Sequence, residues 1–210
     1  MDPNLIANTL SITLFIVALF ISLRAFYLYV QTRSRRVFIL ALSMGVISLT
    51  AAAGFLGDNV TTVSLNVDWF NYIGQTISFL FILLSLVKSS DDYLRRLMRW
   101  HIVISLLLLL LFLFAPVLPP EFPAPAFTKS FLSGSRGVIC MATFFYYFSA
   151  FMSKETRFSL LMSIAFFLFS VGYLMIIPKY SIPNLDVVDR LGDTTRICGL
   201  VVLFVNVLRG

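Results

Sequence analysis

The sequence predicts an all-α polytopic membrane protein, a seven-transmembrane-helix bundle with its N-terminus outside and its C-terminus in the cytoplasm. Of its 210 residues, 59% are hydrophobic and 12% are charged, and the mean hydropathy is +0.93. An ordinary soluble domain is about half apolar and about a quarter charged. The chain therefore has too little polar surface for a soluble enzyme, a nucleic-acid-binding module or a disordered protein.

The apolar residues form seven continuous runs, each close to the ~20 residues that a helix needs to cross the hydrocarbon core of a bilayer. Continuous rather than alternating apolarity favours helices over strands. The N-terminus has no positively charged segment, so the first run is not a cleavable signal peptide. We expect one domain over residues 1–210, with helices at about 5–30, 37–57, 68–88, 98–116, 131–152, 157–177 and 188–208.

Each pair of runs is separated by charged or turn-forming residues. The proline-rich fourth break is expected to be a stiff outer connector. The breaks are TRSRR at 32–36, GDN at 57–59, SSDDYLRR at 89–96, PVLPPEFPAP at 116–125, SKETR at 153–157 and PKYSIPN at 178–184.

The basic residues predict the orientation of the helices. Cytoplasmic loops of membrane proteins carry an excess of Lys and Arg. The breaks after the first, third, fifth and seventh runs hold ten of the 16 basic residues, and the opposite side holds three. This distribution places the N-terminus outside and the C-terminus inside. The three remaining arginines, Arg24, Arg136 and Arg196, lie within runs.

Charged residues and the single histidine gather in the third break, and we expect them to fill the connection there. Most of them are interpreted as topology determinants that also reach anionic lipid headgroups. The group consists of Asp91, Asp92, Arg95, Arg96, Arg99 and His101. Cys140 and Cys198 lie inside apolar runs and are expected to be small buried hydrophobic residues rather than a disulfide.

Three runs carry polar stripes that begin near the outer surface. Residues spaced by three, four or seven positions share one face of a helix. Lipid cannot solvate such stripes, so they should face the bundle interior. The sets are Asp68, Tyr72 and Gln75; Arg136, Cys140, Thr143 and Tyr147; and Asp189, Asp193 and Arg196.

Two interpretations of these stripes stay open. In the first, they line a ligand pocket open to the outside, and the arginines favour an anionic or carbonyl-bearing ligand. In the second, Asp193 pairs with Arg136 or Arg196 as a structural ion pair, and the tyrosines belong to the interfacial aromatic belt. The ligand-binding candidates are Tyr72, Gln75, Arg136, Tyr147, Asp193 and Arg196.

Known catalytic and cofactor chemistry is missing from the sequence. One histidine is too few for a bis-histidine haem or a histidine-based metal site. A retinal pigment needs a lysine in the middle of the last run, and the nearest is Lys179 in the preceding break. Metalloprotease, hydrolase and P-loop motifs are also missing. We expect no catalytic residues, no cofactor and no metal, and hence no enzyme in this chain.

The layout resembles the seven-helix membrane-associated sensor domains that precede histidine kinases and diguanylate cyclases in bacteria. The segments that carry the likeness are YIGQTISFLFILLSLVKSS at 72–90, KETRFSLLMSIAFFLFSVGYL at 154–174 and GDTTRICGL at 192–200. The resemblance implies an input domain of the bacterial plasma membrane that detects a small or lipophilic ligand and signals through its last helix. Its expected partners are membrane lipids and that ligand, without nucleic acid; a homodimer and a C-terminal signalling domain stay open.

The alternative is a small-solute transporter of the 3+1+3 layout found in SWEET-type sugar transporters. Residues 36–43 resemble residues 156–163, and Tyr27 falls on Tyr147 at the same offset. Against this alternative, the Pro-Gln pair of the PQ-loop family is missing, and prolines lie in the breaks rather than within runs. Alternating access commonly uses broken helices.

Overall fold

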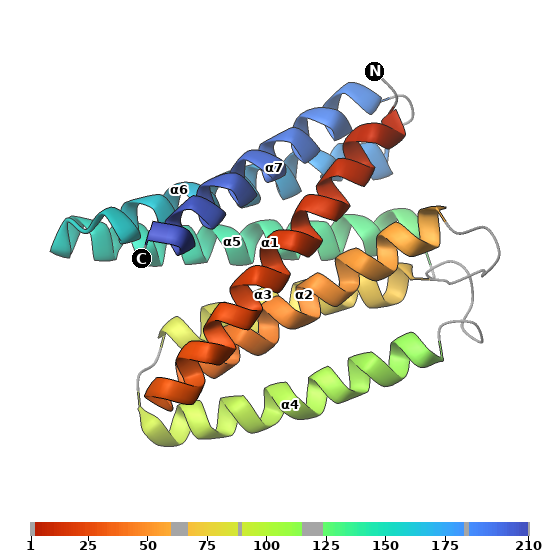
Figure 1. Cartoon of the computed structure of the whole chain (residues 1–210). Coiled ribbons are helices and arrows are strands. Elements are labelled where there is room, and N and C mark those ends of the chain that lie inside the picture. The colour runs from red at the N-terminus through yellow and green to blue at the C-terminus, as the bar shows by residue number, and fades with distance from the viewer. Residues whose placement is uncertain (1–2, 60–66, 88–89, 115–123, 183–184, 210) are drawn as a thin grey trace. The chain divides into compact units, whose positions relative to one another are not determined.

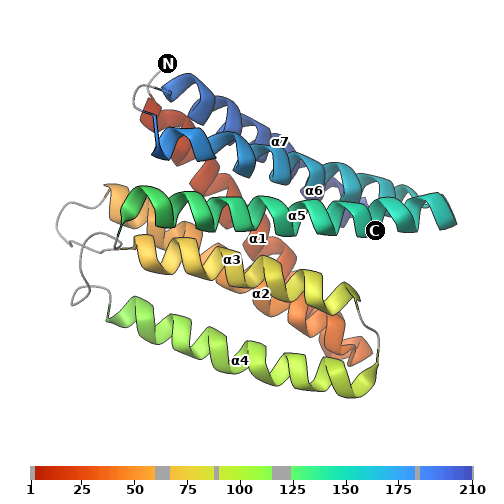
Figure 2. The same cartoon turned by 180° about the vertical axis from the view of Figure 1, so that it is seen from behind.

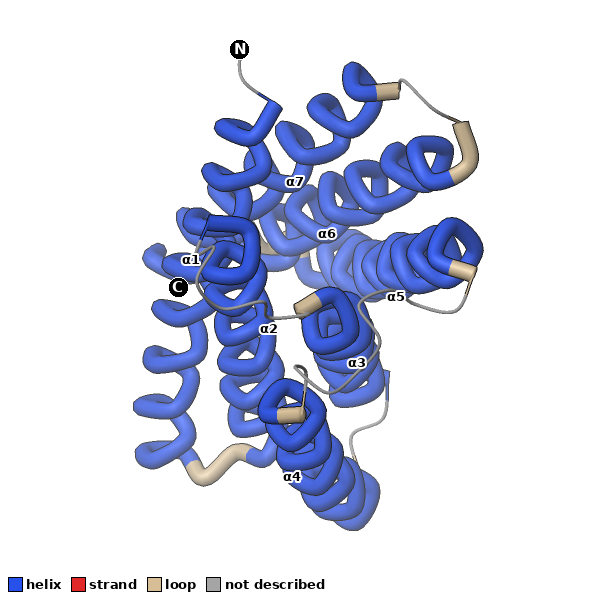
Figure 3. The backbone as a smooth tube through the Cα atoms, turned by 90° about the vertical axis from the view of Figure 1, so that its right-hand side faces the viewer, coloured by secondary structure: helices blue, strands red, loops and turns tan. Residues whose placement is uncertain are grey.

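The computed structural model describes residues 3–59, 67–87, 90–114, 124–182 and 185–209. Within these ranges the regular structure is helical (Figure 3). The elements are α1 (Pro3–Thr32), α2 (Arg35–Asn59), α3 (Asp68–Val87), α4 (Asp91–Leu113), α5 (Pro125–Lys154), α6 (Arg157–Ile176), the 3₁₀ turn η2 (Ile177–Tyr180) and α7 (Asp186–Arg209). The expected proline-rich connector lies largely outside the described residues.

Six of these helices, all except α5, are long and apolar enough to cross a membrane. Several such helices indicate a multi-pass membrane protein, and the predicted all-α class is confirmed for the described residues. Although α5 has 30 residues, its serines, tyrosines and Arg136 dilute its apolar character. Its membrane crossing stays a prediction.

The chain divides into two compact units. The N-terminal unit is Leu14–Pro123, and the C-terminal unit combines Met1–Thr13 with Ala124–Gly210. Each unit has its own packed interior, described below. The expectation of a single seven-helix domain stays a prediction.

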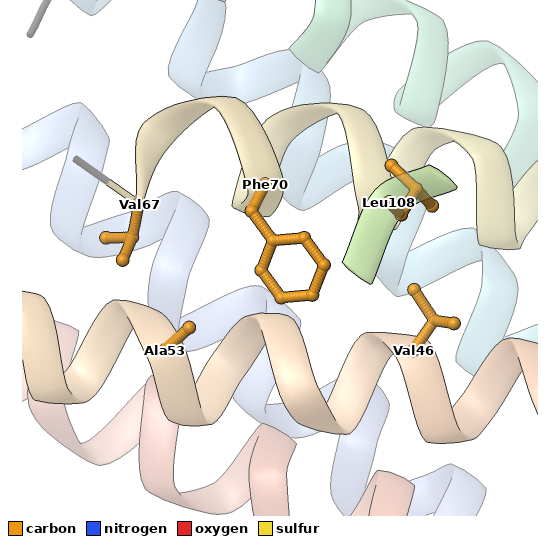
Figure 4. Close-up of a cluster of buried hydrophobic side chains, with 5 residues drawn as sticks. All are labelled: Val46, Ala53, Val67, Phe70 and Leu108. Atoms are coloured by element: carbon orange, nitrogen blue, oxygen red, sulfur yellow. The ribbon is translucent and has the colours of Figure 1, made fainter. Parts of the chain in front are cut away.

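In the N-terminal unit, α2, α3 and α4 pack against one another (Figure 2). Figure 4 shows the Phe70 ring of α3 directed at α2, between Ala53 and Val46. Leu108 of α4 completes this buried cluster, and the Phe70 ring lies 4.9 Å from the Phe112 ring. Helix α1 is divided between the units, and its residues from Leu14 onward belong to this one. They are joined to α2 by the hydrogen bond from Ser22 Oγ to the Ala41 carbonyl (2.8 Å).

In the C-terminal unit, α5, α6 and α7 run side by side (Figure 1). A two-residue connection separates α5 from α6: Glu155 takes a left-handed conformation (φ 49°), and Thr156 caps α6. The Thr156 hydroxyl accepts a hydrogen bond from the Ser159 amide. Such a cap satisfies one of the amides that the first turn of a helix leaves unpaired. The short connection makes α5 and α6 antiparallel neighbours.

The predicted boundaries of two helices are wrong at their starts. The structure begins α4 at Asp91 rather than at about 98, and α5 at Pro125 rather than at about 131. Charged residues can continue a helix beyond the bilayer, and Asp91 and Asp92 suit the positive end of the helix dipole. His101 is therefore not part of a connection: it is buried within α4. Cys140 is buried as expected, whereas Cys198 is exposed on α7.

Candidate functional site

Arg136 is the buried cation of α5, with only 5% of its surface exposed. Its Nη2 donates to Ser133 Oγ at 3.1 Å, and its Nε donates to the Leu132 carbonyl at 3.4 Å. The guanidinium carbon also lies 4.7 Å from the centre of the Tyr173 ring of α6, a cation–π distance. Arg136 therefore points into the C-terminal unit, as the polar stripe of α5 predicts.

The second guanidinium group comes from α7 and approaches the same ring. Arg196 Cζ lies 5.1 Å from the centre of the Tyr173 ring. Arg196 Nη2 forms an ion pair with Asp193 Oδ1 on the same helix, and both side chains are largely buried. Tyr173 thus receives an arginine from each neighbouring helix, and Asp193 forms one of the two pairings that the sequence leaves open, the pair with Arg196.

Ser133 extends this cluster toward η2. Its hydroxyl lies 3.4 Å from Tyr180 Oη, and either atom can donate. Ser133 is buried, and Tyr180 is the last residue of the 3₁₀ turn that follows α6. Polar contacts therefore continue from Arg136 to the end of α6. We call Ser133, Arg136, Tyr173, Asp193 and Arg196 the arginine cluster.

Glycines allow the helices that hold the arginine cluster to approach closely. A Cβ atom on Gly172 would lie 2.5 Å from Arg196 Cγ and 2.8 Å from the Gly192 carbonyl oxygen. A Cβ atom on Gly137 would lie 2.8 Å from the Leu174 side chain. Small residues at helix contacts in membranes bring backbones together in this way. The absence of a side chain at Gly172 is what lets Arg196 lie across the backbone of α6.

Two interhelical hydrogen bonds also join the helices of this unit. Ser170 Oγ donates to the Gly137 carbonyl at 2.8 Å, joining α6 to α5. Asn206 Nδ2 donates to the Phe158 carbonyl at 3.2 Å, joining the last turns of α7 to the start of α6. The arginine cluster and the Asn206 contact lie toward opposite ends of α7, so α6 and α7 are joined along their length.

The candidate residues predicted from the sequence divide between the two units. Arg136, Asp193 and Arg196 meet in the arginine cluster. Tyr147 is half-buried elsewhere on α5, stacked on Phe166 with ring centres 6.0 Å apart. Two candidates belong to α3 of the N-terminal unit: Gln75 is buried and donates to Asn71 Oδ1 at 2.5 Å, and the Tyr72 carbonyl accepts from Thr76 Oγ1. Their convergence with the arginine cluster stays a prediction.

Two residues of the cluster were missed in the sequence analysis, Ser133 and, with more consequence for the cluster, Tyr173. It lies in an apolar run without a charged neighbour, and its side chain is 4% exposed. A signal was present: Ser159, Ser163, Ser170 and Tyr173 follow helical spacing on one buried face of α6.

The charged groups of the arginine cluster are mostly cationic. Within the described ranges, no group of three or more His, Cys, Asp or Glu residues is placed to hold a metal ion. Two guanidinium groups and one carboxylate give a formal excess of one positive charge. Arginine donors bind carboxylate and phosphate oxygens. Comparison of the chain with protein-family models, curated proteins and solved structures finds no match in any of the three.

Proposed function

We propose that the chain is a sensory domain of the bacterial plasma membrane. In this proposal all seven helices, α5 included, cross the bilayer, with the N-terminus outside and the C-terminus in the cytoplasm. The domain binds a small or lipophilic anionic or carbonyl-bearing ligand at the arginine cluster. The observation that carries the proposal is the pair of buried guanidinium groups beside the Tyr173 ring.

The physical reason is the cost of a charge at membrane depth. A charged side chain at the centre of a membrane helix costs about 2.5–3.5 kcal/mol on insertion scales, and such residues commonly mark functional sites. Asp193 neutralises Arg196 within the cluster. An anionic or carbonyl-bearing ligand would accept hydrogen bonds from the arginine donors of the cluster.

Signal output would follow from the position of Arg196 on α7. A ligand that contacts Arg196 more strongly in one pose of α7 shifts the population toward that pose. The other end of α7 contacts the start of α6 through Asn206. In the proposed orientation this end faces the cytoplasm, where a signalling module would receive the change.

The first experiment measures ligand binding and the position of α7 together. Purified protein is titrated with octanoate, a carboxylate with an apolar body, and its thermal unfolding is followed. Spin labels at exposed positions 157 and 209 report the distance between the start of α6 and the end of α7. We expect octanoate to raise the melting temperature and to shift this distance. Arg136→Gln should abolish both effects, while Lys154→Gln at the exposed end of α5 should leave them.

A transporter of the 3+1+3 layout is the second candidate. The division into two compact units favours it, and residues 36–43 and 156–163, which resemble each other, begin α2 and α6, one in each unit. Counterflow of labelled octanoate in liposomes, without a distance change at α7, would favour transport. If octanoate is neither bound nor transported, the arginine cluster is a structural ion-pair site.

A further inference from the structure

We propose that the exposed face of α4 is a binding site for an anionic phospholipid, with its phosphate on the first turns of the helix and an acyl chain along the rest. This site lies in the N-terminal unit and does not depend on the proposed sensory function.

The first turns of α4 carry an exposed basic stripe. Arg95, Arg96 and Arg99 are all exposed, whereas Leu94 and Leu97 on the opposite side of the helix are buried. Residues three and four positions apart are neighbours on a helix surface. The three guanidinium groups therefore share one face of α4 and lie within reach of one phosphate group, for which arginine is well suited.

The same face becomes apolar immediately after Arg99. Trp100 is 59% exposed, and its neighbours along the face are exposed valine and leucine side chains. Spacings of three, four and seven residues continue the stripe through Val103, Leu106, Leu107 and Leu110. A phospholipid has the same order of chemistry, an anionic headgroup followed by an apolar chain. Tryptophan is typical of the boundary between the two regions.

The start of α2 adds further basic groups beside the start of α4. Arg35 Nη1 lies 2.6 Å from Asp91 Oδ2, which joins the first turns of the two helices. Arg36 follows on α2, and its buried Nε has no hydrogen-bond partner among the described residues. Residues 33–36 and 91–99 together contain six arginines and two aspartates. This excess explains why an anionic headgroup is preferred over a zwitterionic one.

Trp100 supplies a probe at the proposed site. The full chain carrying Trp69→Phe, which leaves Trp100 as its tryptophan, is reconstituted in phosphatidylcholine vesicles. Quenching of Trp100 is compared for phosphatidylglycerol and phosphatidylcholine with brominated acyl chains at equal mole fractions. We expect the anionic lipid to be preferred by about fivefold or more, since one basic residue near an anionic surface already contributes about that factor.

Three variants test which charges are responsible. Arg95→Gln/Arg96→Gln/Arg99→Gln should remove the preference. Lys154→Gln/Arg157→Gln/Arg209→Gln removes three exposed charges from the C-terminal unit and should leave it. Arg95→Lys/Arg96→Lys/Arg99→Lys retains the charge, and hence the orientation, and should keep most of the preference. If the first combined variant does not fold, Arg96→Gln and Arg99→Gln singly should each lower the preference. No preference in the parent, or equal losses in both glutamine triples, would overturn the proposal.

Discussion

The two units bury polar side chains of similar type but surround them differently. In the C-terminal unit, Arg136 and Ser170 donate to buried oxygens, and Asp193 pairs with Arg196. In the N-terminal unit, Ser78 Oγ, Ser105 Oγ and His101 Nδ1 are buried without a hydrogen-bond partner among the described residues, whereas in the C-terminal unit Arg196 Nε is such an atom. Lipid offers no replacement partners, so the unpartnered groups should destabilise the N-terminal unit, whereas the partnered groups should stabilise the C-terminal unit.

These three unpartnered atoms of the N-terminal unit lie within about one helical turn of one another, between two apolar clusters. The ring pairs Phe70–Phe112 and Phe81–His101 share one antiparallel register of α3 and α4. This register brings Ser78 to the level of Ser105, one turn from His101. On one side lies the cluster of Figure 4, and on the other lie Ile39, Leu94 and Leu97. Burial alone therefore does not indicate a functional polar site. Whether a buried polar group stabilises or destabilises the fold depends on whether it has hydrogen-bond partners.

The largest effect should come from breaking the buried ion pair of the C-terminal unit. Asp193→Asn leaves the Arg196 charge without its carboxylate, and losing one partner of a buried pair costs about 3–5 kcal/mol. The free energy of unfolding in detergent micelles, measured by denaturant titration, checks this. Asp189→Asn is the matched control, because the Lys179–Asp189 pair is more exposed and should contribute about 1 kcal/mol or less. Equal losses in both variants would contradict a special role for the buried pair.

A smaller loss is expected where α6 and α7 touch. Gly172→Ala places a Cβ atom 2.5 Å from Arg196 Cγ, and overpacking of this kind costs about 1–3 kcal/mol. The same Cβ atom would lie 2.8 Å from the Gly192 carbonyl oxygen, so a movement of the Arg196 side chain alone would not relieve the clash. Gly134→Ala is the control, since its Cβ would meet Ile177 at an ordinary 3.5 Å. Unfolding curves should separate the two variants, and an unchanged Gly172→Ala protein would show that α7 is loosely held.

The sequence predicted the helices better than their ends. Apolar runs of bilayer length predict helices because a helix needs such a run to cross the hydrocarbon core, and six such helices are present in the described ranges. The sequence predicts the start of α4 too late because arginines and aspartates indicate a break, although they are compatible with a helix that extends into the headgroup region. The same error assigned His101 to a connection rather than to a buried position.

The candidate site was predicted in part. Arg136, Asp193 and Arg196 were found because charges within apolar runs are rare. Tyr173 was missed because its helical spacing with Ser170 indicates a shared face of α6 but does not reveal the two arginines that approach its ring. The closeness of Arg196 to Gly172 is a tertiary contact between α6 and α7, and spacing along one helix cannot reveal it.

Removing an unpartnered hydroxyl from the N-terminal unit should instead raise the free energy of unfolding. Ser78→Ala and Ser105→Ala each remove a buried hydroxyl that has no partner among the described residues. An unsatisfied buried polar group costs about 1–3 kcal/mol, so each variant should gain stability, by about 1 kcal/mol after the loss of side-chain packing. Denaturant titration of each variant measures the gain. A loss of stability in both would mean that these hydroxyls are hydrogen-bonded in the membrane-embedded protein, and the contrast between the units would fail.

The smallest effect compares one matched hydrogen bond from each unit. Ser22 Oγ donates to the Ala41 carbonyl and Ser170 Oγ donates to the Gly137 carbonyl, both at 2.8 Å and both from buried serines. Interhelical hydrogen bonds in membrane proteins average about 0.6 kcal/mol, so Ser22→Ala and Ser170→Ala should each lower stability by about that amount. Because the two bonds match in length and burial, their costs should agree even though the units differ elsewhere. A much larger loss for Ser170→Ala would place the difference between the units in helix packing around Gly137, rather than in the partners of their buried polar groups.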